Sequence, residues 1–423
     1  MYRKDVLPNG IRVVTHDLPN RESISIGFWI GVGGRYENDA QKGAAHFLEH
    51  ILFKGSQKYA CEEIKEKIEG VGGNLNAFTS EEQTCFYAKI PSKHLNQTFD
   101  VLSDMVTAPL IKKGDVEKEK TVILEEIKMY HDVPQYYVIE LLEQLVWPDH
   151  PLGKNLAGSL DSVSKLNYQD LRGFHKTFYA PSNIVIAACG NLNHDKILKL
   201  VKEKFGHLSN RSYPDYEKAS ISQTKPRFKF HKRDIEQMHL VFGLPGYDER
   251  HKDRFAMSLL SVLLGGNMSS RLFVEVREKQ GLAYSICSAA KTLHDTGIFL
   301  IRAGVDNNKV TKAIDLIIKQ LNKIKKYTVP ISEFNRAREY LLGQLLIGLE
   351  DTMEHMLWLG EAMIVKNEMR TLKKVIKEFE SVTPDDIKRV AREILDLNHI
   401  NLAMVGPILP DQEIQIQRLI EGA

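Results

Sequence analysis

Residues 167–192 read NYQDLRGFHKTFYAPSNIVIAACGNL, and residues 383–408 read TPDDIKRVAREILDLNHINLAMVGPI. Each stretch begins with a residue suited to cap a helix, Asn167 or Thr383, and continues with an amphipathic helical pattern. A short turn then leads into an apolar strand that stops at a glycine, and the two stretches align without a gap. A unit that recurs after about 200 residues is too long for a stacked array of repeats. The sequence therefore predicts two domains of similar fold.

The beginnings of the two halves agree with a duplication. SISIGFWIGVGGRYE (23–37) and MHLVFGLPGYDER (238–250) both read as a strand, a glycine turn and a charged loop. Some strand patterns alternate with helices and others follow one another through turns, which favours an α+β fold with antiparallel-rich sheets covered by helices. We therefore expect domains at 1–207 and 229–423, joined by a polar linker at 208–228. The alternative is two unrelated domains that share a common helix–strand ending.

The composition excludes several classes of protein. The 423 residues are 43% apolar and 26% charged, as in a soluble globular protein, and the formal net charge is only +2. Without a basic stripe that carries interleaved aromatic residues, nucleic acid is not an expected partner. Four widely spaced cysteines without a CxxC pair indicate reduced thiols. With no apolar leader pattern and no run long enough to span a membrane, we expect a cytoplasmic protein.

The segment GAAHFLEHILF (43–53) combines three ionisable side chains with otherwise small or apolar ones. In a helix, His46, Glu49 and His50 project within one 100° arc. Histidines at i and i+4 can bind one zinc ion, and a carboxylate beside them that is not a ligand can serve as general base. The order HxxEH is the inverzincin pattern. The alternative is that both histidines hydrogen-bond to neighbours while Glu49 reaches solvent.

A catalytic zinc ion requires a third protein ligand. The helical pattern of 114–132 has an apolar stripe centred on Ile127. Glu126 and Glu119 lie 100° and 80° from Ile127 on the same flank of this stripe, whereas Glu125 faces away from it. Helical phase therefore selects Glu126 as the ligand, with Glu119 two turns earlier as its support. The alternative is that these carboxylates form the solvated face of a surface helix.

The chain resembles the pitrilysin-type zinc metallopeptidases, in particular a single-chain bacterial member of the mitochondrial processing peptidase branch. The first half carries this resemblance in LPNGIRVV, GGRYE, GAAHFLEH, GGNLNAFTSEEQT, VILEEI and HPLG, and the second half in GGNMSSRLFVEVREKQGLAYSI. The resemblance implies two similar α+β domains. It also implies one Zn²⁺ bound by His46, His50 and Glu126, with Glu49 as general base.

The resemblance also implies where a peptide would bind. The stretch 72–90 reads as a glycine turn followed by a strand, and Asn76 and Ala77 fall at the position where family members pair an edge strand with substrate. On the residues alone, an ordinary sheet strand explains this stretch nearly as well.

In the second half, Arg277 and Tyr284 resemble the Arg/Tyr pair with which family members hold substrate. The alternative is a surface arginine paired with Glu275 or Glu278. In heterodimeric members the zinc motif and the Arg/Tyr pair lie on different chains. Because one chain carries both here, we expect a homodimer.

These observations predict a zinc-dependent endopeptidase that cleaves peptides or unfolded segments of polypeptide. The main alternative is a non-catalytic structural or partner subunit of the same fold, and such chains usually lack one or more of the zinc residues. A zinc hydrolase for a small non-peptide substrate is a weaker alternative, because it leaves the peptide-pairing strand unexplained.

Overall fold

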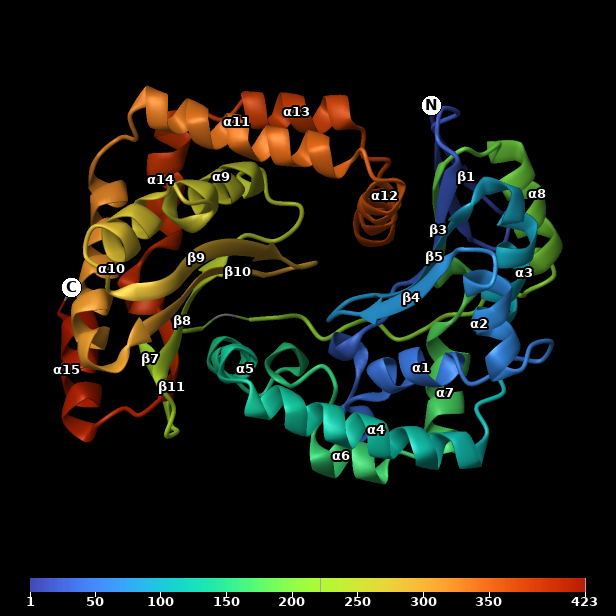
Figure 1. The fold of residues 1–423 in the computed structure, drawn as a ribbon, viewed down its shortest axis with the longest axis horizontal. Helices are drawn as coiled ribbons and strands as arrows, with labels where there is room; N and C mark the ends of the chain where they lie inside the picture. The colour runs from blue at the N-terminus through green and yellow to red at the C-terminus, as the bar shows by residue number, and fades with distance from the viewer. Residues whose placement is uncertain (221, 423) are drawn as a thin grey trace. The chain divides into compact units, whose positions relative to one another are not determined.

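Two β-sheets organise the chain (Figure 1). The computed structural model describes residues 1–220 and 222–422. In the first sheet the strands lie in the order β1 (Tyr2–Val6), β2 (Arg12–Asp17), β6 (Ile184–Gly190), β3 (Ser23–Ile30), β5 (Thr84–Pro91) and β4 (Asn74–Thr79). In the second sheet the order is β7 (Arg227–Lys232), β11 (Asn401–Gly406), β8 (Gln237–Gly246), β10 (Gly297–Asp306) and β9 (Ala283–Thr292).

The two sheets share one topology. Strand β2 pairs parallel with β6, as β7 does with β11, and the next three strands of each sheet are joined by antiparallel pairs. The first sheet differs only by its extra outer strand β1, which pairs antiparallel with β2. This correspondence confirms the predicted α+β fold of two similar halves, because unrelated domains would not share strand order and strand direction together.

The two repeated segments also begin in the same way. Helix α7 (Tyr168–Phe178) and helix α14 (Pro384–Ile394) each start with a capping box. Asn167 accepts a hydrogen bond from the backbone of Asp170, and Thr383 accepts one from the backbone of Asp386. The carboxylate of each aspartate in turn accepts a hydrogen bond from the backbone N–H of its cap residue. The strands that follow both end at glycines with positive φ, Gly190 (+131°) and Gly406 (+158°).

The compact units do not follow the two halves of the chain. The first unit comprises Met1–Lys128, Asn155–Glu217 and Leu345–Leu372, and the second comprises Met129–Lys154, Lys218–Gln344 and Lys373–Ala423. The connection at 217/218 falls inside the linker predicted at 208–228, but each unit also takes a segment from the other half. Continuous domains at 1–207 and 229–423 therefore differ from the observed division.

One α-helix lies wholly within each segment that a unit takes from the other half of the chain. Helix α12 (Thr352–Lys366), from the second half of the chain, packs on β2, β3 and β6. Helix α5 (Pro134–Val146), from the first half, packs on β7, β8 and β11. The strands covered by α12 correspond to the strands covered by α5. Each sheet is therefore covered on one face by a helix that is distant in sequence.

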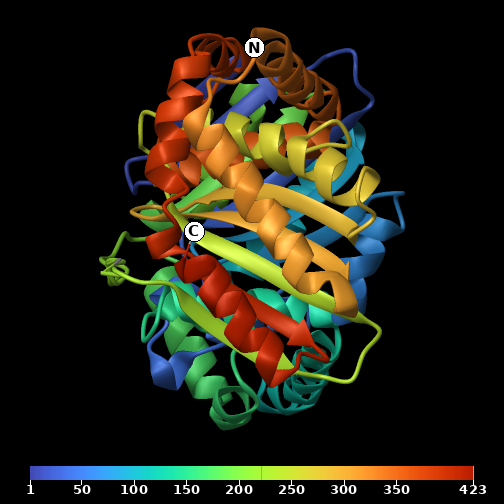
Figure 2. The same ribbon diagram turned by 90° about the vertical axis from the view of Figure 1, so that its left-hand side faces the viewer.

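Further helices pack on the strands within each unit. In the first unit, α1 and α3 pack against β5, and α8 packs against β2. Besides α12, the helices that lie wholly or mainly in this unit are α1 (Ala44–Leu52), α2 (Cys61–Glu69), α3 (Leu95–Thr107), α4 (Lys113–Asp132), α6 (Leu160–Lys165), α7 and α8 (His194–Phe205). In the second unit, α9, α10 and α14 cover the sheet, and they lie in front of it in Figure 2. Besides α5, the helices that lie wholly or mainly in the second unit are α9 (Arg254–Gly265), α10 (Val310–Lys326), α11 (Ile331–Gly348), α13 (Leu372–Glu380), α14 and α15 (Pro410–Glu421).

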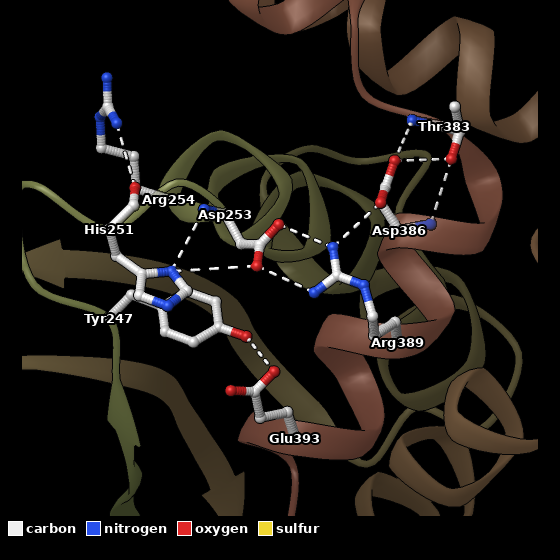
Figure 3. A network of polar contacts seen from close by, with 8 residues as sticks. All are labelled: Tyr247, His251, Asp253, Arg254, Thr383, Asp386, Arg389 and Glu393. Carbon is white, nitrogen blue, oxygen red and sulfur yellow. Dashed lines mark hydrogen bonds and ion pairs between the residues drawn. The ribbon is translucent and has the colours of Figure 1, made fainter.

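A polar network orients α14 in the second unit (Figure 3). The guanidinium group of Arg389 donates to both carboxylate oxygens of Asp253, over 2.7 and 2.8 Å. Nearby, the hydroxyl of Tyr247 donates to Glu393 (2.7 Å), and its ring stacks on His251. Arg389 is about half exposed, so this fork fixes the direction of α14 more than it stabilises the fold.

Two predictions that concern the whole chain can be compared with the structure. The four cysteines are all unpaired thiols, as their spacing predicts. Among the described residues, no helix combines the length and the apolar character needed to cross a lipid bilayer.

Candidate metal centre

Helix α1 carries the HxxEH residues, and a buried carboxylate fixes where it begins. Glu37 accepts hydrogen bonds from the backbone N–H groups of Gly43 (3.0 Å) and Ala45 (2.7 Å). An anion at this end also favours the helix through its dipole. The apolar face of α1 is fully buried in the first unit, whereas His46, Glu49 and His50 are half-buried on the remaining face. The predicted common arc is therefore present in the structure.

Glu126 of α4 joins the two histidines. Its Oε2 lies 3.4 Å from Nε2 of His50 and 3.9 Å from Nε2 of His46. One donor atom from each of the three side chains falls within 4.8 Å of the others. The imidazole rings are 4.7 Å apart and tilted by 64°, so that they converge instead of stacking. Two helices that are distant in sequence thus form one cluster of donors.

Helical phase distinguishes Glu126 from its neighbour as predicted. The side chain of Glu125 is 66% exposed and pairs with Lys128, whereas that of Glu126 is 20% exposed and faces the histidines. Ile123 and Ile127 are fully buried and hold α4 in this rotation. Because adjacent residues on a helix differ by 100°, only one of two successive glutamates can face α1.

Glu119 supports the cluster from behind His50. Its Oε1 lies 3.0 Å from Nδ1 of His50, and its Oε2 lies 2.5 Å from Nζ of Lys54. A carboxylate on Nδ1 fixes the ring and leaves Nε2 available as a ligand. Burial lowers the pKa of His50, but hydrogen bonds to Glu126 and Glu119 outweigh burial, and the pKa is raised overall. In His46, where burial dominates and the charge of His50 adds to it, the pKa is lowered to about 4.

The donor set fits a zinc ion. Ligands about 2.0–2.1 Å from a tetrahedral ion lie roughly 3.3 Å from one another, close to the shorter of the two separations from Glu126. Two imidazoles and one carboxylate are the ligands of a known class of catalytic zinc site, which keeps its fourth position open. Nδ1 of His46 is buried and has no hydrogen-bond partner among the described residues. His46 is therefore held in place by packing and by its neighbours at Nε2.

Glu49 faces the end of an edge strand. Its Oε2 accepts a hydrogen bond of 2.6 Å from the hydroxyl of Thr79, the last residue of β4. Burial raises the pKa of Glu49, while the Thr79 bond and the charge of His50 act in the opposite direction. Unlike Glu126, Glu49 makes no ion pair with the histidines at salt-bridge distance among the described residues. Glu126 therefore belongs to the cluster of donors, whereas Glu49 lies beside it.

Asn76 and Ala77 lie in β4, which is the outermost strand of the first sheet and, within the described part of the chain, pairs with β5 alone. Asn76 is exposed and Ala77 is half-buried. The N–H of Ala77 donates to the side-chain oxygen of Asn76 (2.8 Å), so the edge carries a local hydrogen bond that an incoming strand would have to replace.

Arg277 and Tyr284 lie close together in the second unit. The guanidinium carbon of Arg277 is 5.7 Å from the centre of the Tyr284 ring and 4.7 Å from that of Phe273. Tyr284 is 74% exposed, at the start of the outer strand β9. Within the described residues Arg277 forms no ion pair with Glu275, which pairs with Lys279 instead. The helix that carries Arg277 is a π-helix over Phe273–Glu278, a local form that often marks functional sites.

Sequence reasoning did not identify two residues of the first unit that complete the site. Lys54 follows His50 by four positions, so helical periodicity contained a signal for it. Thr79 carries no such signal, because its contact with Glu49 joins a strand end to a helix 30 residues earlier.

Known proteins are similar to this chain over nearly its whole length. Residues 12–160 match the family described as insulinase (peptidase family M16), and residues 165–341 match the peptidase M16 inactive domain. An uncharacterized zinc protease of Streptomyces coelicolor is 37% identical, with 97% of this chain and 90% of that protein covered. The uncharacterized zinc protease YmxG of Bacillus subtilis is 34% identical, with 96% and 98% covered. The crystal structure of a protease from Helicobacter pylori has a TM-score of 0.90 at 24% identity and covers 96% of this chain and 99% of that one.

The chain belongs to peptidase family M16. This result confirms the predicted resemblance to the pitrilysin-type peptidases, and the structural match extends the shared fold over nearly the whole chain. Relatives named as zinc proteases support a peptidase function. A cytoplasmic location remains a prediction from the sequence.

Proposed function

We propose that this protein is a zinc-dependent endopeptidase that cleaves peptides or unfolded segments of polypeptide. The observation that supports it most is the convergence of His46, His50 and Glu126 beside Glu49, which itself adjoins an edge strand. Relatives that carry the name zinc protease add to this support.

In this proposal His46, His50 and Glu126 hold one zinc ion per chain, and Glu119 with Lys54 orients His50. Zinc, when bound, supplies a Lewis acid that acidifies a coordinated water toward a pKa of about 7 and polarises the scissile carbonyl. Glu49 accepts the proton of the attacking water and then delivers it to the leaving amine. The hydrogen bond from Thr79 keeps the carboxylate of Glu49 oriented and favours its ionised form.

The edge of β4 offers backbone groups to an extended peptide at Asn76 and Ala77. Strand addition recognises the main chain, so it suits an enzyme with little preference for particular side chains and a substrate that has no stable fold of its own. Arg277 would hold substrate carbonyls through its fork of N–H donors, and Tyr284 would donate its hydroxyl to the scissile carbonyl. Since one chain carries the zinc motif and the Arg/Tyr pair, we further propose a homodimer.

The competing proposal is a non-catalytic partner or structural subunit of the same fold. The observation in favour of this alternative is the description of the second matching segment as an inactive domain, but that segment, 165–341, contains none of the candidate zinc ligands. The retention of both histidines, Glu126 and Glu49 argues against it, because a scaffold needs neither the donors nor a base next to them.

Hydrolysis of quenched fluorescent peptides, measured together with metal content, tests the proposal. Wild-type protein should contain zinc and cleave the peptide, and a chelator should abolish cleavage until zinc is restored. Glu49→Gln should retain the zinc while turnover falls by about 10²–10⁴-fold. An unfolded protein should be cleaved much faster than the same protein in its folded state. A zinc-loaded wild-type protein without peptidase activity would favour the scaffold, and loss of the metal in Glu49→Gln would refute the assigned roles.

A further inference from the structure

A second group of potential metal ligands lies on the first sheet, away from the HxxEH site. Tyr2, His16 and Cys189 are in lateral register across the adjacent strands β1, β2 and β6. Residues in register project from the same face of a sheet. Helix α12 packs on this face and brings His355 over the row, with the rings of His16 and His355 4.5 Å apart. The other face of the sheet carries the apolar core that includes α1.

The hydrogen bonds of His355 define which of its nitrogens is available. Nδ1 lies 3.2 Å from the carbonyl oxygen of Leu349 and therefore acts as the donor. Nε2 then carries the lone pair, and it lies 2.9 Å from the hydroxyl of Tyr2. A histidine that donates one N–H to a backbone carbonyl while its other nitrogen points into a cluster has the arrangement typical of a metal ligand.

His16 and Cys189 supply the other two candidate donors of this cluster. Nδ1 of His16 is buried without a hydrogen-bond partner among the described residues, which is unfavourable unless something else binds there. The side chain of Cys189 is fully buried. One donor atom each from His16, Cys189 and His355 lies within 4.8 Å of the others, the same limit that the HxxEH donors meet.

We propose that His16, Cys189 and His355 form a second metal site, which binds Zn²⁺ or a similar divalent transition metal. One thiolate and two imidazoles suit a borderline-soft ion, and such sets exclude Ca²⁺ and Mg²⁺, which require oxygen ligands. On binding, the thiol of Cys189 loses its proton to solvent as the sulfur–metal bond forms, and the ion replaces the hydrogen bond from Tyr2 to His355. The ion would link α12 to two strands that precede it by more than 160 residues.

The sulfur ligand distinguishes this site from the HxxEH site, whose donors are nitrogen and oxygen only. Cobalt(II) makes the difference visible, because only a bound thiolate gives an intense near-ultraviolet charge-transfer band. The full-length protein loaded with Co²⁺ should hold two equivalents and show this band. His46→Ala combined with His50→Ala should hold one equivalent and keep the band, so the test does not depend on peptidase activity.

Cys189→Ser should lose the thiolate band and one equivalent while keeping the cobalt spectrum of the HxxEH site, which also reports that the first unit is folded. The matched control is Cys85→Ser, an equally buried cysteine on β5 of the same sheet, and it should keep both equivalents and the band. If Cys189→Ser does not fold, His355→Gln provides the same comparison. Absence of the band in wild-type protein, its persistence in Cys189→Ser or its loss in Cys85→Ser would overturn the proposal.

Discussion

Thr79→Val removes the hydroxyl that donates to Glu49 and replaces it with a methyl group of similar size. The hydrogen bond is short, 2.6 Å, and its acceptor is the carboxylate that we assign as general base. Because the bond favours the ionised carboxylate, its loss should raise the pKa of Glu49 further in the direction in which burial already moves it. The expected effect is therefore a loss of activity at low pH.

The size of the effect follows from the strength of the bond. Hydrogen bonds to charged groups contribute about 1.5–3 kcal/mol, and 1.36 kcal/mol corresponds to about one pKa unit. Thr79 and Glu49 are both half-buried, so the lower end of this range applies. The pH at which kcat/KM is half-maximal on the acid side should rise by about one unit. At pH values below this acid limb, kcat/KM should fall about tenfold. Activity well above the limb should change little.

The assay is kcat/KM for a fluorescent peptide over a range of pH values, with zinc content measured in the same samples. Thr84→Val is the matched control, because Thr84 lies opposite Thr79 in the β4–β5 pair and its hydroxyl donates to the carbonyl of Val32 instead. This variant should lower thermal stability and leave the acid limb in place. A uniform loss at every pH in Thr79→Val, or an equal shift in the control, would refute the reasoning.

Three further outcomes are expected. Glu126→Gln should lose most of the zinc affinity measured by titration, whereas Glu125→Gln should bind zinc like wild-type protein; the reverse order would contradict the observed rotation of α4. If the zinc motif and the Arg/Tyr pair act across a dimer, mixing inactive Glu49→Gln with inactive Arg277→Ala should restore about a quarter of wild-type activity. A mixture that exchanges subunits without any gain in activity would exclude a site shared between two chains. Burial lowers the pKa of His175 from 6.5 to about 4, so an unfolded chain binds more protons below pH 6.5 and stability falls as the pH decreases through that window. His175→Gln should remove up to about 1.4 kcal/mol per pH unit of this dependence in denaturant titrations of metal-free protein, and an unchanged slope would show that His175 does not titrate as inferred.

The proposed peptidase and the proposed second metal site are separable in experiment. The first depends on residues of α1 and α4, and the second on β2, β6 and α12. Peptidase activity could therefore fail while the thiolate site is found, or the reverse. The second proposal adds a metal link between α12 and the strands β2 and β6 to the packing of α12 on the first sheet.

The sequence by itself determined the features that depend on local geometry. The 100° arc of His46, Glu49 and His50 and the choice of Glu126 over Glu125 follow from helical rotation, which is the same in any tertiary setting. The duplication was readable because cap, helix, turn and strand recur at the same spacing, and each of these signals lies within a few residues.

Only the tertiary structure decided which distant segments meet. The contact of Thr79 with Glu49 depends on the register between β4 and β5 and on the packing of α1 against both strands. Similarly, α12 and α5 each have an apolar face that fits a sheet, but their own sequences do not specify which sheet they cover. Hydrophobic burial is non-directional, so the partner is selected by chain connectivity and the shape of the whole core and not by local pattern.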